Sequence, residues 1–123
     1  MIYPSWIELP AKDADRAAAF YKSVFEFDAS EVYDDGERRV SILLHPADGK
    51  PGISVNETKN FEPSTNGTLV YLNVGSALAP FLERTVAAGG KILTEQTAMS
   101  ETSVYAIIRD SEGNAIALSF SAD

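Results

Sequence analysis

Two widely separated stretches of the chain present hydrophobic and polar residues in the same order. Each begins with alternating apolar and polar residues, over 6–10 and 68–74, which is typical of a strand. Each continues into apolar residues spaced three and four positions apart, which predicts a helix that buries one face. The two helical stripes consist of Ala17, Phe20, Tyr21 and Val24, and of Leu78, Phe81, Leu82 and Thr85. The pattern therefore predicts one strand–helix unit that is used twice.

Three further strands are predicted after each helix from apolar runs bounded by turn residues. They cover residues 27–33, 38–45 and 52–55 in the first half, and residues 91–95, 103–109 and 115–121 in the second. Asp35-Gly36 predicts a hairpin turn, and residues 110–114 predict another. Each half thus reads as strand, helix and three strands, or βαβββ.

These elements indicate an α+β fold in a single domain, because 123 residues leave room for one core. We assign residues 1–57 to the first βαβββ module and residues 67–123 to the second. Residues 58–66, with Pro63 and little apolar content, form the linker between them.

Composition narrows the classes of function. The formal net charge of −8 disfavours nucleic acid and anionic membranes as partners, because phosphate binding depends on clustered Lys and Arg. No apolar run approaches the roughly 18 residues of a membrane span, and the first residues lack the pattern of a signal peptide. The chain contains no Cys, which removes disulfides and thiolate chemistry. We therefore expect a cytoplasmic protein.

The side chains of one sheet face follow from strand parity, since alternate residues of a strand point to opposite faces. If Ile7 and Leu9 pack on the helix, Trp6 and Glu8 lie on the other, inner face. The same rule places further inner-face residues on the later strands: Leu69, Tyr71, Asn73, Tyr105, Ala117 and Ser119. Such an aromatic and apolar lining with a few polar groups is typical of a small-molecule site.

Glu8 is the sharpest candidate for chemistry, because an acid within an apolar strand is costly to bury without a partner. Burial would raise its pKa and suit it to general acid–base catalysis. It could equally orient a cationic or hydroxylated ligand. The structural alternative is that Glu8 is held by Arg109, a Tyr hydroxyl or backbone donors, or is solvated at an open edge.

The other candidates also have two interpretations each. Trp6, Tyr71 and Tyr105 could stack on a flat ligand, or fill a core or dimer interface. Asn73 and Ser119 could bind a ligand or a neighbouring backbone group.

Three further polar features of the sequence have a structural interpretation. His45, at a strand end, could be an acid–base group at the rim of the cleft or a surface residue. Asp13 and Asp15 stand where acids cap a helix start, so we do not assign them to a metal site. Residues 110–114 are interpreted as a hairpin without a catalytic role.

Three motifs resemble those of the vicinal oxygen chelate superfamily, which includes glyoxalase I, extradiol dioxygenases, fosfomycin-resistance proteins and bleomycin-resistance proteins. They are the Asp13-x-Asp15-Arg16-x-x-x-Phe20-Tyr21 helix entry, the Ala87-Ala88-Gly89-Gly90-Lys91 helix exit and the Arg109-Asp110-x-Glu112-Gly113-Asn114 turn. The resemblance covers nearly the whole chain. It implies that the tandem modules form a curled mixed sheet with a concave cleft, and that two chains usually pair to complete the sites.

The same resemblance implies where metal-dependent relatives hold a divalent ion. Those positions carry Trp6, Leu69 and Ala117 here, and none of these side chains can bind a metal. The chain also has a single His, so two imidazoles per site are not available. An oxygen-only magnesium or manganese site, with Glu8 as its first ligand, is the metal site left open. No second inward carboxylate is evident to complete that site, so we expect no cofactor.

Three functions follow as hypotheses. The first is a metal-independent, homodimeric small-molecule binding protein whose cleft takes an amphipathic, aromatic or cationic compound. The second is a lyase, isomerase or dioxygenase-type enzyme in which Glu8 is an acid–base residue or an atypical metal ligand. The third is a structural or regulatory dimer whose cleft is filled by its own side chains.

Overall fold

The computed structural model describes residues 1–122 and contains two helices and eight strands. In chain order the elements are β1 (Trp6–Pro10), α1 (Ala14–Phe25), β2 (Tyr33–Asp34), β3 (Arg39–Leu44), β4 (Gly52–Glu57), β5 (Val70–Asn73), α2 (Ala79–Ala87), β6 (Lys91–Ala98), β7 (Ser103–Arg109) and β8 (Ala115–Ser121). The repeated order of strand, helix and three strands confirms the α+β fold that the sequence patterns predict.

The strands form two separate four-stranded sheets. The first has the order β1-β4-β3-β2 and the second the order β5-β8-β7-β6. In each sheet the opening strand pairs in parallel with the last strand of the same half, and the remaining pairs are antiparallel. Among residues 1–122 no strand of one sheet pairs with the other sheet, so β1 and β5 each leave one edge open.

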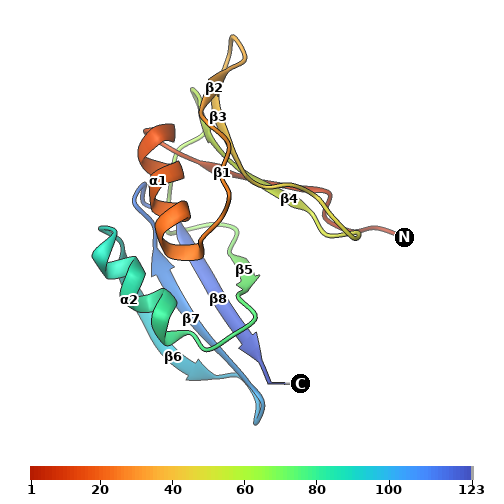
Figure 1. Ribbon diagram of the computed structural model, residues 1–123, viewed down its shortest axis with the longest axis vertical. Coiled ribbons are helices and arrows are strands. Elements are labelled where there is room, and N and C mark those ends of the chain that lie inside the picture. The colour runs from red at the N-terminus through yellow and green to blue at the C-terminus, as the bar shows by residue number, and fades with distance from the viewer. Residues whose placement is uncertain (123) are drawn as a thin grey trace.

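Both helices lie together on one side of the molecule, and the two sheets diverge from them (Figure 1). The predicted stripes face one shared core, in which Tyr21, Val24, Leu78 and Thr85 are fully buried. Because α1 and α2 also pack against each other, one hydrophobic core serves both halves. No helix in the described residues is long and apolar enough to cross a membrane.

One predicted strand is wrong. The sequence predicts a full strand over residues 27–33, yet only Tyr33–Asp34 pairs regularly with β3. Instead, Ser30 makes local bonds: its backbone N–H donates to the Ile42 carbonyl at 2.8 Å, and its hydroxyl accepts from the Ile42 N–H at 2.9 Å. At Ser30, bonds through the backbone and the side chain therefore tie the segment to β3 without a regular ladder.

Candidate functional site

Strand parity holds for β1. Leu9 is buried in the core on the helix side, and Ile7 packs against it, whereas Trp6 and Glu8 point to the opposite face. A pocket of about 480 Å³ runs along the open edge of β1, where residues of both strand faces line it, and its far wall comes from the linker and the start of the second sheet. Its lining includes Trp6, Glu8, Phe61, Glu62, Ser64, Asn66, Thr68, Val70, Asn114 and Ala115.

Trp6 is held in place from two sides. Its indole lies against Gly52 of β4, where an added Cβ would come within 2.4 Å of the ring. Its Nε1–H donates to the Ser54 hydroxyl at 3.1 Å, and the buried Asn56 amide donates to the same oxygen at 3.0 Å. Trp6 as a whole is still 38% exposed and lines the pocket, so a positioned aromatic side chain remains available there.

Glu8 is paired with Arg38, a residue of the turn between β2 and β3. Arg38 Nη1 donates to both carboxylate oxygens of Glu8, at 3.2 and 3.3 Å, and its Nε donates to Asp35 at 3.2 Å. The hydrogen bond that Arg38 donates to Asp35 and the negative charge of Glu8 raise the pKa of Arg38. Because the Glu8 side chain is 43% exposed, the burial assumed for an acid–base role is not present in the single chain.

The inner face of the second sheet carries a pair of aromatic rings. Tyr71 and Tyr105 have ring centroids 6.4 Å apart, and Tyr71 is about half exposed. Ser119 pairs with Asn73 on one side and Tyr105 on the other. The Asn73 side chain accepts from the Gly75 N–H at 2.9 Å, so it serves the turn after β5.

Leu69 and Ala117 lie in different surroundings. Leu69 lines a smaller hollow of about 290 Å³ with Leu93, Ile107 and Ala115. Ala117 is completely buried within β8. The structure therefore brings Trp6 and Glu8 into one pocket, and it places the remaining ligand-binding candidates on the second sheet or, for Leu69, just before it, outside that pocket.

The donor set does not fit a divalent metal. Within residues 1–122 no group of three or more His, Cys, Asp or Glu side chains could hold an ion. His45 is exposed at the end of β3. The charged neighbour of Glu8 is a guanidinium rather than a second carboxylate, which opposes the oxygen-only site as well.

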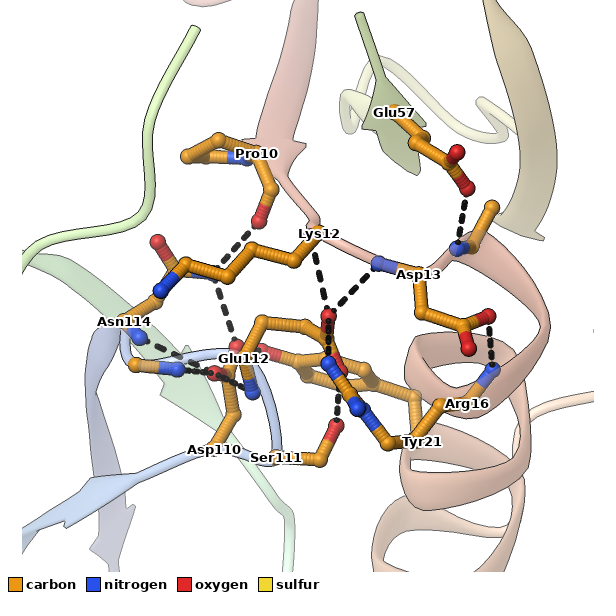
Figure 2. A network of polar contacts seen from close by, with 12 residues as sticks. Pro10, Lys12, Asp13, Arg16, Tyr21, Glu57, Asp110, Ser111, Glu112 and Asn114 are labelled. Atoms are coloured by element: carbon orange, nitrogen blue, oxygen red, sulfur yellow. Dashed lines mark hydrogen bonds and ion pairs between the residues drawn. The ribbon is translucent and has the colours of Figure 1, made fainter.

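A polar network joins the β7–β8 turn to the segment before α1 (Figure 2). Glu112 accepts from the backbone N–H groups of Lys12 and Asp13, both at 2.9 Å, and from Arg16 at 2.8 and 3.0 Å. Asn114 donates to the Pro10 carbonyl at 2.8 Å. Residues 110–114 form the turn between the antiparallel strands β7 and β8, as predicted, and the network gives the side chains of Glu112 and Asn114 structural partners.

Asp110 organises the turn itself and reaches into the core. One of its oxygens accepts from three backbone N–H groups, those of Glu112, Gly113 and Asn114, each at 2.9 Å. The other accepts from the buried Tyr21 hydroxyl at 2.5 Å. Burial, together with the Asp110 charge, raises the pKa of Tyr21 well above its usual value.

Glu112 stays ionised despite its burial. Its side chain is only 1% exposed, and burial alone would raise its pKa. Hydrogen bonds from Arg16, Ser111 and the Asp13 backbone outweigh this effect, and the pKa is lowered. Asp13 in turn accepts from the Arg16 N–H at 3.1 Å, as expected of a helix cap.

Sequence reasoning missed three residues around the pocket. Phe61 and Glu62 lie in the segment that the sequence predicts to be a linker, and Arg38 follows a hairpin turn. No periodicity marks them, because their proximity to β1 arises from the path of the chain rather than from strand parity.

Comparison with known proteins agrees with this architecture. The family model described as Glyoxalase/Bleomycin resistance protein/Dioxygenase superfamily matches residues 4–118. No curated protein gives a significant match.

Solved structures with the same fold cover almost the whole chain at low sequence identity. A glyoxylase/bleomycin resistance protein/dioxygenase domain from Frankia sp. EAN1pec has a TM-score of 0.76 at 16% identity, covering 98% of both chains. A glyoxalase-related enzyme from Fulvimarina pelagi has a TM-score of 0.74 at 20% identity, covering 98% of this chain and 89% of its own. The fosfomycin resistance protein FosX from Listeria monocytogenes has a TM-score of 0.71 at 15% identity, covering 99% and 95%. At these identities the likeness shows the fold.

Proposed function

Since the chain belongs to the glyoxalase/bleomycin resistance protein/dioxygenase superfamily, we propose that it is a metal-independent small-molecule binding protein that acts as a homodimer. Its ligand is an amphipathic, aromatic or cationic compound. The pocket beside β1 is the primary site, with Trp6 and Glu8 as the contacts that the first sheet supplies.

The observation that carries this proposal is the chemistry of the inner faces. Where the family resemblance implies metal ligands, the chain has Trp6, Leu69 and Ala117, which lack donors for a divalent ion. In their place the pocket offers an indole fixed against Gly52 and backed by Ser54. A rigid aromatic wall beside polar groups is suited to binding by shape and stacking.

Pairing of two chains is supported by the exposed aromatic side chains on the open faces. Trp6 and Tyr71 are large apolar residues on different sheets, and both remain well exposed in the single chain. A second copy that packs against these faces would bury that surface and enclose the ligand.

The first test is metal binding. The purified protein is incubated with excess manganese, nickel, zinc and iron(II), dialysed and analysed for bound metal. We expect far less than one equivalent per chain. One equivalent of a tightly held ion that is lost in Glu8→Gln would overturn the metal-independent proposal.

The second test uses Trp6 as its own reporter, because it is the single Trp of the chain. Aromatic probe compounds are titrated while the tryptophan emission is recorded, and light scattering gives the mass in solution. We expect saturable changes in emission and a mass of twice 13.3 kDa. A monomer whose emission responds to no probe would contradict the proposal.

An enzymatic function is the second candidate, and the position of Glu8 on the pocket wall is the observation in its favour. In this alternative Glu8 is an acid–base residue or an atypical metal ligand. Its ion pair with Arg38 weighs against it, because a general base needs a free carboxylate oxygen toward the substrate. Loss of turnover with intact probe binding in Glu8→Gln would favour the enzyme.

A further inference from the structure

The charged residues that line the pocket have one sign. Glu8 lies on the β1 side and Glu62 on the linker side, and none of the described lining residues is Lys, Arg or His. Within residues 1–122, Glu62 has no ion-pair partner. Trp6 and Phe61 add an aromatic ring from each side. Two carboxylates and two aromatic rings on the lining of one pocket favour a positively charged guest over a neutral or anionic one.

A cationic group of the protein itself, the Arg38 guanidinium, already pairs with Glu8. The Arg38 guanidinium donates to both oxygens of Glu8, although Arg38 comes from a turn and does not line the pocket. Its Nε is also held by Asp35, whose backbone N–H donates to the Arg38 carbonyl at 3.0 Å. The turn therefore presents a guanidinium to the carboxylate that a cationic ligand would need.

We propose that the pocket beside β1 binds a compound carrying one amine or guanidinium group next to an aromatic ring, and that Arg38 competes with this ligand for Glu8. The inference rests on the proposed function and names the ligand class of the same site. Glu62 is assigned as the second carboxylate that faces the positive group, and Trp6 as the ring that stacks on the ligand.

The geometry of the ion pair allows the exchange. Side chains of Glu8 and Arg38 are 43% and 37% exposed, so water and salt weaken their attraction and a ligand can replace the guanidinium at little cost. When Arg38 leaves Glu8, Asp35 still holds its Nε, which keeps the turn in place. The competitor thus remains close and lowers the apparent affinity for every cation that binds Glu8.

The test is a fluorescence titration of the full chain with four probes of similar size: benzylammonium, benzamidinium, benzyl alcohol and benzoate. Emission of Trp6 gives the dissociation constant of each. We expect the two cations to bind at least about tenfold more tightly than benzyl alcohol, and benzoate to bind most weakly. High salt should narrow this difference.

Three variants separate the roles of the charges. Arg38→Gln should tighten binding of both cations by about two- to fivefold without changing benzyl alcohol, because an exposed ion pair is worth that much. Glu62→Gln should weaken the cations only. Arg39→Gln is the matched control, since the neighbouring Arg39 pairs with Asp15 and Glu57, neither of which lines the pocket, and it should leave all four constants unchanged.

Each contrary result has a distinct meaning. Equal binding of benzyl alcohol and the cations would overturn the cation assignment and leave small-molecule binding standing. Weaker or unchanged cation binding in Arg38→Gln would overturn the competitor role. A response of Trp6 to none of the four probes would overturn this inference and the proposed site together.

Discussion

The indole of Trp6 lies directly over the backbone of Gly52, so the parallel pairing of β1 with β4 leaves no room for a side chain at the glycine. A Cβ at Gly52 would also meet the Leu44 carbonyl oxygen at 2.9 Å. The aromatic wall of the pocket therefore depends on a residue that has no functional group of its own.

Gly52→Ala should displace the indole and destabilise the fold by about 1–3 kcal/mol, because a methyl group is forced into a packed site. Urea unfolding measures the loss, and a shift of the tryptophan emission reports the displacement. The double variant Gly52→Ala/Trp6→Ala should lose less than the sum of the two single variants, since the ring clash is then absent. Strict additivity would show that the Leu44 contact, and not Trp6, sets the cost.

Glu112→Gln should destabilise the protein by about 2–3 kcal/mol at neutral pH. It removes the charge of a buried carboxylate that accepts hydrogen bonds from two backbone N–H groups and from Arg16. Chemical unfolding measures this change. Glu83→Gln is the matched control, since it removes the same charge from an exposed position of α2 and should be nearly neutral. A loss as large in the control would point to net charge instead.

The cost of Glu112→Gln should also depend on pH. The pKa of Glu112 is lowered in the folded state, so the unfolded chain takes up the proton first as the pH falls. The stabilisation is therefore complete above the ordinary carboxyl pKa of about 4.3 and is lost as the pH falls through the lower, folded value. Unfolding curves of both proteins should converge in that acidic range; a constant difference would contradict the ionised state of Glu112.

Tyr21→Phe should cost about 1–2 kcal/mol, because it removes the donor to the buried Asp110 carboxylate. The raised pKa of Tyr21 predicts that its stabilisation is complete below about pH 10 and is lost as the pH rises through the folded value. Difference spectra between wild type and variant should show Tyr21 ionising only together with alkaline unfolding. Ionisation in the native protein near pH 10 would oppose this expectation.

Asp13 and Asp15 should differ although both stand at the start of α1. Asp13→Ala removes the cap on the Arg16 N–H and should cost about 1 kcal/mol. Asp15→Ala removes an exposed ion pair with Arg39 and should be nearly neutral. Thermal unfolding compares the two; equal losses would mean that charge near the helix start, rather than the cap, provides the stabilisation.

Periodicity was sufficient for the regular parts of the fold. The stripes of both helices and the bounds of β7 and β8 agree with the sequence prediction, because burial of one face imposes a fixed spacing. It failed at residues 27–33, where the Ser30 side chain bonds to β3 and removes the need for a ladder. Side-chain competition of this kind leaves no trace in an apolar pattern.

The residues of the candidate site were likewise predictable only where they lie on a single strand. Parity placed Trp6 and Glu8 on one face, since that follows from a single strand. It could not identify Arg38 as the partner of Glu8, because that contact spans a turn and depends on how far β2 and β3 reach beyond β1. Nor could it bring Phe61 and Glu62 into the pocket, as a linker has no repeat to follow.

The bond between the 110–114 turn and the start of α1 makes the duplicated halves unequal. The segment leading into α1 draws its backbone acceptor, Glu112, from the other half, whereas the start of α2 has no side-chain cap. The two βαβββ modules are therefore not interchangeable. If the chain were cut within the linker, the two pieces should behave as complementing fragments that need each other to fold.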